Sequence, residues 1–188
     1  SKKLGFIGGV DIPLIRNFAC GYAQGVKAIN PKAEITQNMV GTTSGAWNDP
    51  AKGGELARSQ FERGVDVVFA VAGGSGMGTL QMAKEKGKLA IGVDSNQNGL
   101  YPGSILTSMV KRVDNTVYDS FMEVKNGTWK GGVSYKGLKE GGVDWALDAN
   151  NRKLITPEIE KRVLGARKDI IDGKIKVIDY RVGSSCPV

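Results

Sequence analysis

Residues 65–94 read VDVVFAVAGGSGMGTLQMAKEKGKLAIGVD and decide the fold of this chain. An apolar, β-branched run over 65–72 predicts a buried strand, and the glycine-rich turn over 73–78 leads into a short helical pattern. A second apolar run over 89–93 predicts another strand with Asp94 at its tip. Two short buried strands joined by one helix are expected to be parallel, with a right-handed crossover. Because open α/β sheets bind ligands outside the carboxyl ends of their strands, we expect a small-molecule site near the turn and Asp94.

The alternation of strand and helix patterns continues on both sides of this stretch. It predicts an α/β fold, with a parallel sheet flanked by helices. On the helix pattern that precedes Asn30, the small residues Gly21 and Gly25 are expected to pack closely on the sheet. After residue 105 the alternation of strands and helices becomes irregular, and the predicted elements there have no obvious neighbour in the sheet. The expected strands are 4–7, 33–40, 65–72, 89–93, 105–110, 131–139 and 143–147, and the later helices are 114–126 and one that begins after Thr156.

Composition excludes several classes of function. The 188-residue chain carries a net charge of +7, but its basic residues are scattered, which favours a solvated basic surface over a nucleic-acid interface. It contains no histidine, and its two cysteines have no CxxC spacing, so we expect neither a metal site nor a cofactor. Cys20 lies in a helix pattern and is typical of a buried thiol, while Cys186 lies in a C-terminal tail. The sequence alone does not decide whether the two cysteines form a disulfide.

One alternative is a NAD-dependent oxidoreductase. Residues 74–78, GSGMG, follow a strand, and Asp94 lies about twenty residues further on, which resembles the dinucleotide-binding fingerprint. However, the position of the third glycine is occupied by Thr79. No nucleophile with a neighbouring base is recognisable, and no histidine or tyrosine–lysine pair is available for proton transfer. We therefore expect a binding protein and not an enzyme.

Three side chains are candidate ligand contacts. Trp47 follows a glycine-containing loop after the strand 33–40, where an indole could stack on a flat base or pack as a lid on the core. The carboxylate of Asp94 suits a vicinal diol such as that of ribose, although a helix cap or a surface ion pair is the simpler interpretation. Lys111 ends the strand 105–110 and could donate to a sugar hydroxyl or a ring nitrogen, or remain solvated.

Several segments together resemble the basic membrane protein (BMP) family, the substrate-binding lipoproteins of ABC transporters that include purine nucleoside receptors. They are GFIGGVDIPLIRNFACGYAQGVKAINP, WNDPAKGGELARSQFERGVDVVFAVAGGSGMGTLQMAKEKGKLAIGVDSNQ, SILTSMVKRVD and GLKEGGVDWALD. The resemblance implies a type I periplasmic-binding-protein fold whose two lobes hold a purine nucleoside and deliver it to an ABC permease. It also implies that Trp47 stacks on the base, Asp94 binds the ribose hydroxyls, Lys111 contacts the nucleoside from the hinge side, and Gly73 lies against the ligand, with Ala72 and Gly74 as neighbours.

The resemblance further implies how the lobes divide the chain. Residues 1–105 and 148–188 would form the second lobe, and 106–147 would belong to the first lobe, whose N-terminal part precedes GFIGG in family members and is absent here. That missing segment would be a partner that supplies half of the pocket, so we expect this chain alone to bind nucleosides weakly or not at all. A signalling domain that reuses the fold is a further alternative. The family location is the periplasm or the outer face of the cytoplasmic membrane, as a lipoprotein whose signal and attachment site lie outside this chain.

Overall fold

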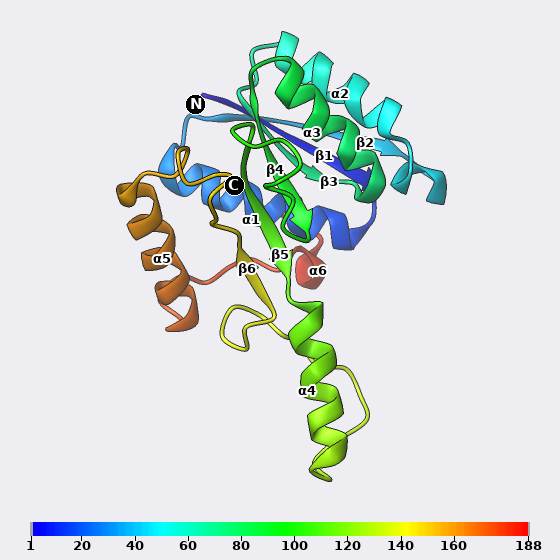
Figure 1. Ribbon diagram of the computed structural model, residues 1–188, viewed down its shortest axis with the longest axis vertical. Helices are drawn as coiled ribbons and strands as arrows, with labels where there is room; N and C mark the ends of the chain where they lie inside the picture. Colours follow the sequence, from blue (N-terminus) through cyan, green and yellow to red (C-terminus); the bar gives the residue numbers. More distant parts are fainter. Residues whose placement is uncertain (1, 188) are drawn as a thin grey trace.

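The computed structural model describes residues 2–187 and contains a six-stranded sheet in the order β2-β1-β3-β4-β5-β6 (Figure 1). Strands β1 to β5 pair in parallel, whereas β6 runs antiparallel to β5. The expected α/β fold with a parallel sheet is therefore confirmed, and the more polar strand after Pro31 lies at an edge. The strands are β1 (Lys3–Val10), β2 (Glu34–Gly41), β3 (Val67–Val71), β4 (Leu89–Asp94), β5 (Ile105–Lys111) and β6 (Val143–Trp145).

Helices cover both faces of the sheet. Adjacent residues of β1 point to opposite faces: Ile7 packs with α2 and α3, and Phe6 packs with α1. Asp49 and Thr156 cap α2 and α5 through their side chains, as their positions before Pro50 and Pro157 predict. The helices are α1 (Pro13–Ile29), α2 (Pro50–Glu62), α3 (Gly76–Glu85), α4 (Val113–Lys125), α5 (Pro157–Ile171) and α6 (Tyr180–Gly183), with two 3-10 turns, η1 (Ser44–Trp47) and η2 (Gly73–Ser75).

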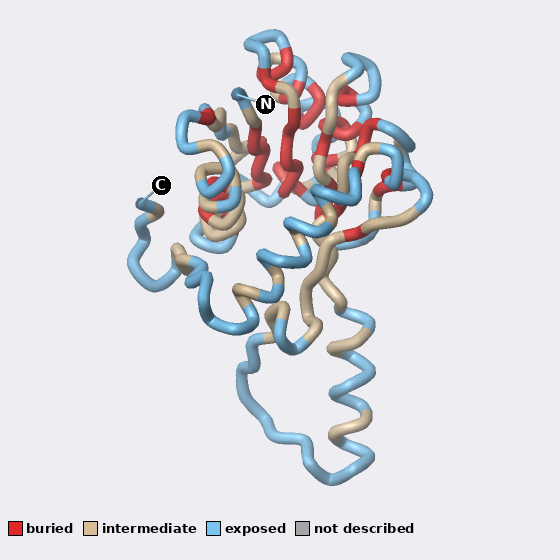
Figure 2. Tube along the Cα trace, turned by 90° about the vertical axis from the view of Figure 1, so that its left-hand side faces the viewer, coloured by how far each residue is buried: buried red, intermediate tan, exposed pale blue. Residues whose placement is uncertain are grey.

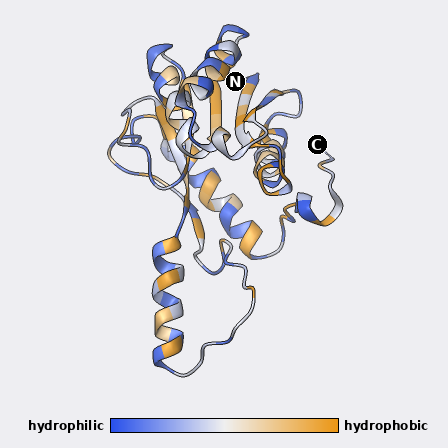
Figure 3. Ribbon diagram, turned by 90° about the vertical axis from the view of Figure 1, so that its right-hand side faces the viewer, coloured by the Kyte–Doolittle hydropathy of each residue, from blue (hydrophilic) through white to orange (hydrophobic). Residues whose placement is uncertain are grey.

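Residues 113–142, here called the arm, project away from the body of the protein (Figure 1). The arm consists of α4 and an exposed return loop, and α4 has no buried residue (Figure 2). Apolar residues recur along α4 (Figure 3), and their side chains are exposed, with Phe121 72% and Val124 62% exposed. The predicted strand over 131–139 is wrong: this part of the loop has no strand neighbour to pair with, and Gly132 adopts a φ of +135°.

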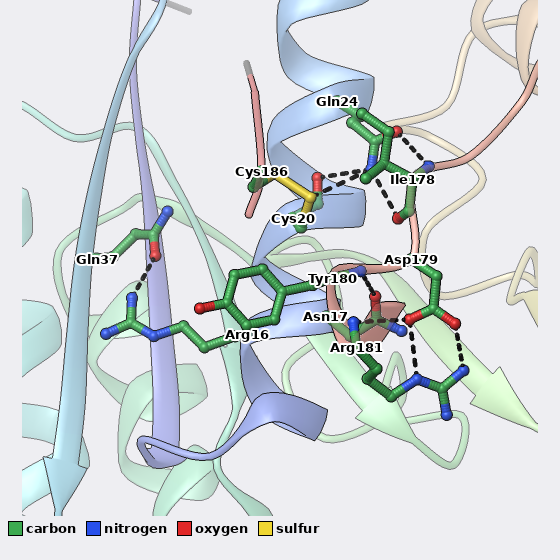
Figure 4. Close-up of a disulfide and its surroundings, with 10 residues drawn as sticks. All are labelled: Arg16, Asn17, Cys20, Gln24, Gln37, Ile178, Asp179, Tyr180, Arg181 and Cys186. Carbon is green, nitrogen blue, oxygen red and sulfur yellow. Dashed lines mark hydrogen bonds and ion pairs between the residues drawn. A yellow bond between two sulfur atoms is a disulfide. The ribbon is translucent and has the colours of Figure 1, made fainter. Parts of the chain in front are cut away.

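The C-terminal tail, residues 172–187, folds back on α1. A disulfide joins Cys20 of α1 to Cys186, with the Cα atoms 5.7 Å apart (Figure 4). The interpretation of Cys20 as a free buried thiol is therefore wrong. The disulfide that the sequence left undecided is present in the structure. Gln24 adds two hydrogen bonds to the tail backbone, because its amide donates to the carbonyl of Ile178 at 3.3 Å and its oxygen accepts from the N–H of Ile178 at 2.8 Å.

The gap between α1 and α5 overturns one packing prediction. Gly21 and Gly25 do not pack on the sheet, because no heavy atom beyond the adjoining backbone of α1 lies within 4 Å of the point where a Cβ would stand at either residue. They line an apolar hollow of about 460 Å³ whose other wall is the apolar stripe of α5. Among residues 2–187, no helix combines the length and the apolar character that crossing a membrane requires.

Candidate ligand-binding site

The predicted site residues all follow the carboxyl ends of strands. Trp47 lies in η1 after β2, Gly73 opens η2 after β3, and Asp94 and Lys111 are the last residues of β4 and β5. Because these strands are parallel, their carboxyl ends form one edge of the sheet. The four residues therefore lie along the same edge, in two groups whose local contacts differ.

The first group is built around the indole of Trp47. The ring is half-buried and packs against the apolar cluster that lines the α1 face of the sheet. It lies over the backbone of Gly9, where a Cβ would stand only 2.3 Å from Cζ3 of the indole. It also lies near Gly73, whose φ is +56° and whose Cβ would stand 3.7 Å from Cε3. Glycines at these two positions therefore make room for the ring.

The neighbours of Gly73 differ in what they offer to a ligand. Ala72 is fully buried, so its side chain is not available at the surface. A Cβ at Gly74 would stand 2.9 Å from Oδ1 of Asn48, which shows how closely η2 approaches the loop that carries Trp47. The glycine pair thus brings two loops from different strands together beside the indole.

The second group is an ion pair between Asp94 and Lys111. Oδ1 of Asp94 and Nζ of Lys111 are 2.7 Å apart, and both side chains are about half exposed. Nζ of Lys111 also lies 5.2 Å from the centre of the Phe18 ring, which makes a cation–π contact. Asp94 has a φ of +68°, a backbone region that aspartate tolerates better than most side chains and that often marks a functional position.

A buried polar network fixes the loop that follows Asp94. The backbone N–H of Gln97 donates to Oγ of Ser108 at 3.0 Å, and that hydroxyl donates to Oδ1 of the fully buried Asn98 at 2.9 Å. The amides of Asn96 and Asn98 both donate to Asp148, at 2.7 and 3.1 Å. The Asn96 amide holds the pKa of the Asp148 carboxyl below its usual value. The network ties the loop after β4 to the segment after β6.

The glycine-rich turn has a structural explanation that does not involve a dinucleotide. A Cβ at Gly78 would stand 1.8 Å from the carbonyl oxygen of Pro50, so α3 and α2 are in direct backbone contact. Thr79, at the position where the fingerprint requires glycine, is fully buried and donates to the carbonyl of Gly53 at 3.2 Å. The turn residues thus serve the packing of α2 on α3, and the NAD-binding alternative has no support in this geometry.

Three contributors to this edge were not singled out by the sequence. Phe18 belongs to the apolar stripe of α1, and that pattern predicts a core residue, although its ring makes a cation–π contact with Lys111. Asn98 lies in a polar loop, and the asparagine-rich composition of that loop is the only signal of its buried role. Ser75 lies in the glycine-rich turn, where nothing in the sequence distinguishes its hydroxyl.

Comparisons with solved structures define the class of fold. A solute-binding protein of an ABC transporter system from Aeropyrum pernix superposes with a TM-score of 0.79 at 28% identity, covering 94% of this chain and 57% of that one. A transcriptional activator of the comK gene from Bacillus halodurans shares the fold alone, with a TM-score of 0.76 at 22% identity and coverage of 100% and 59%. The architecture is therefore that of the periplasmic-binding-protein-like solute-binding proteins.

Sequence comparisons then identify the family. A family model described as the PnrA-like ABC transporter substrate-binding protein (Bmp) matches residues 1–180. Basic membrane protein D of Borreliella burgdorferi is 35% identical over 179 residues, which cover 93% of this chain and 51% of that protein. The ABC transporter nucleoside-binding protein BmpA of Lactococcus lactis is 37% identical over 196 residues, covering 94% and 53%.

This chain belongs to the Bmp family of PnrA-like ABC transporter substrate-binding proteins, a family of binding proteins and not of enzymes. The chain spans about half the length of the curated relatives it matches.

Proposed function

We propose that this chain is part of an extracytoplasmic ABC transporter receptor that binds a purine nucleoside and presents it to a membrane permease. One observation carries the proposal: an indole and a carboxylate–ammonium pair lie along the same carboxyl edge of the sheet. The family membership and the printed name of the Lactococcus relative, a nucleoside-binding protein, support the same substrate class.

Each group at the edge suits one part of a nucleoside. The indole of Trp47, backed by Gly9 and Gly73, provides a flat surface on which a purine base stacks. The carboxylate of Asp94 accepts hydrogen bonds from two vicinal ribose hydroxyls, and Lys111 donates to the sugar or the base. Without a ligand the two charged groups satisfy each other at 2.7 Å, so a nucleoside has to share or replace that ion pair.

We further propose that residues 1–105 and 148–188 form one lobe and that 106–147 belongs to a second lobe completed by another segment of the same protein. The exposed apolar surface of the arm supports this division, because side chains such as Phe121 and Tyr118 have no partner within residues 2–187 that covers them. Monomeric proteins rarely leave such a continuous apolar face in water. Lobe closure on the nucleoside would be a population shift driven by contacts that form only in the closed state.

We also propose the periplasm, or the outer face of the cytoplasmic membrane, as the location of the protein, with a lipid anchor outside this chain. The disulfide between Cys20 and Cys186 supports an oxidising compartment, because disulfides persist mainly outside the reducing cytosol.

Calorimetric titration tests the substrate class. The full-length protein and this chain are titrated with inosine, guanosine and adenosine, with ribose and free adenine as controls. We expect nucleoside binding by the full-length protein, weakened at least tenfold by Trp47→Ala, and weak or undetectable binding by this chain alone. Absence of nucleoside binding by the full-length protein overturns the substrate class. Submicromolar binding by this chain alone overturns the two-lobed pocket, and an NADH fluorescence change favours the oxidoreductase alternative.

A further inference from the structure

The hydroxyl of Ser75 holds the backbone on both sides of Trp47. Its Oγ donates to the carbonyl of Ala46 at 2.7 Å and accepts from the N–H of Asp49 at 2.6 Å. Ala46 precedes the tryptophan directly, and Asp49 follows it by two residues. One oxygen atom therefore fixes the spacing between the two ends of the short segment that carries the indole.

Ser75 is itself firmly held. The residue is fully buried, and its backbone N–H donates to the carbonyl of Ala72 at 3.1 Å. The first turn of α2 packs directly on it, because a Cβ at Gly53 would stand 2.0 Å from the carbonyl oxygen of Ser75. Since the serine is fixed by η2 and α2, its hydroxyl transmits that rigidity to the loop of Trp47.

No other side-chain hydrogen bond recorded among residues 2–187 joins the backbone on both sides of Trp47. The indole itself contacts the backbone of Gly9 and Gly73 and the apolar cluster on the α1 face, and these contacts restrain the ring but do not tie the loop to η2 through a hydrogen bond. The backbone bond from the N–H of Asn48 to the carbonyl of Gly45, at 3.0 Å, shapes the turn itself, and Ser75 is the side chain that ties this turn to η2 and so sets the tilt of the ring.

We propose that Ser75 is a positioning residue for base recognition: it holds the indole of Trp47 in the plane on which a nucleobase stacks. This inference rests on the proposed function, and it assigns to Ser75 a role in orientation without ligand contact. Replacement by alanine leaves the Ala46 carbonyl and the Asp49 N–H without this partner, and the loop of Trp47 gains freedom. The stacking partner is then no longer preorganised, and ordering it on binding costs affinity.

The test follows Trp47 directly and does not need a ligand. Trp129→Phe and Trp145→Phe leave Trp47 as the only tryptophan of this chain. In that background, Ser75→Ala is compared with Thr79→Val, a matched control that removes another fully buried hydroxyl bond on α3 without touching the loop of Trp47. The measurements are acrylamide quenching and fluorescence anisotropy of Trp47 together with the melting temperature, and the nucleoside Kd of the same variants in the full-length protein.

We expect Ser75→Ala to increase the quenching constant of Trp47 by about twofold and to weaken nucleoside binding by roughly tenfold, the scale of ordering one side chain and its loop on binding. Thr79→Val should lower the melting temperature similarly while leaving the quenching and the Kd unchanged. Equal quenching in Ser75→Ala and the parent, or an equal rise in Thr79→Val, overturns the inference. If Ser75→Ala does not fold, Ser75→Cys, with its weaker donor, is judged by the same criteria.

The quenching result separates this inference from the proposed function. A looser Trp47 in a full-length protein that binds no nucleoside refutes the substrate class and leaves the anchoring of Trp47 intact. A Kd that rises in Ser75→Ala without any change in the quenching or anisotropy of Trp47 refutes the positioning role and leaves the nucleoside site intact.

Discussion

Breaking the disulfide between Cys20 and Cys186 should destabilise the chain substantially. The two residues are 166 positions apart, so the crosslink closes nearly the whole chain into a loop. In the chain-entropy treatment, a loop of this length stabilises the folded state by about 5 kcal/mol, and measured disulfides typically contribute about 2–4 kcal/mol. For a protein of this size, a loss of about 3 kcal/mol lowers the melting temperature by roughly 6–12 °C.

Two perturbations reach the same state by different routes. A dithiol reductant such as dithiothreitol reduces the disulfide by two electrons and is itself oxidised to its cyclic disulfide, while the double variant Cys20→Ser, Cys186→Ser lacks the crosslink from the start. Unfolding in urea, followed by circular dichroism, gives the free energy of unfolding for the oxidised, reduced and double-serine proteins. The double variant with and without dithiothreitol is the control for effects of the reductant elsewhere.

Loss of the disulfide should also loosen the C-terminal tail. Without the crosslink, the tail is held to α1 mainly by hydrogen bonds, such as those between Gln24 and Ile178 and the one from the N–H of Tyr180 to Asn17 at 2.8 Å. Hydrogen exchange should therefore accelerate first at Ile178 and Tyr180. The reasoning is refuted if thiol titration of the protein purified without reductant finds two free thiols, or if reduction leaves the free energy of unfolding unchanged.

Three further changes test the packing, the ion pair and the arm. Gly78→Ala should destabilise the chain by about 2–3 kcal/mol, because its Cβ meets a backbone carbonyl of α2, whereas Gly21→Ala should stabilise it by about 0.5–1 kcal/mol in thermal unfolding, because space is open there. Lys111→Met should change stability by less than about 1 kcal/mol, because its ion pair with Asp94 is half exposed, yet it should weaken nucleoside binding by the full-length protein in calorimetry. The exposed apolar surface of α4 should cause this chain to self-associate, and Phe121→Lys, which breaks that surface, should reduce the association measured by sedimentation equilibrium.

The outcomes that contradict these expectations are distinct. Equal effects of alanine at Gly78 and Gly21 would show that the contact between α2 and α3 is looser than the structure has it. A large loss of stability in Lys111→Met would make its ion pair a structural element, and full nucleoside affinity in that variant would remove the lysine from the site. A monomeric parent chain, or unchanged association in Phe121→Lys, would show that the apolar surface of α4 does not drive association of this chain.

The sequence predicted the sheet well because its strands carry strong local signals. Strands β1, β3, β4 and β5 are short, mainly apolar runs, and the more polar β2 begins after Pro31 and ends at Gly41, so the strand positions follow from pattern alone. The same logic placed Trp47, Asp94 and Lys111 along one edge. Parallel strands end at the same edge whatever their order, so this inference did not require knowledge of the strand order.

Contacts between distant segments could not be predicted in this way. Gly21 and Gly25 have the small-residue spacing of a close helix contact, but whether a helix face meets the sheet or a hollow depends on elements far along the chain. The predicted strand over 131–139 failed because alternating residues form a strand only where a neighbouring strand offers hydrogen bonds. The hydroxyl of Ser75 forms its hydrogen bonds only because η1 and η2 lie in contact, and no local sequence pattern predicts that contact.

The ion pair of Asp94 and Lys111 lies where the body of the protein meets the arm. Asp94 ends a strand of the body, while Lys111 is the last residue of β5, and the N–H of the next residue, Arg112, donates to the carbonyl of Gly142 at 2.8 Å at the base of the arm. Under the proposed function, a nucleoside that replaces this ion pair would therefore act on both sides of the junction at once. Because the arm extends far from its two-strand base, a small change in the angle of β5 and β6 moves its distal end by a large distance (Figure 1). Under the proposed function, exchange of the ion pair for ribose contacts would provide the difference between open and closed states that coupling of binding to lobe closure requires.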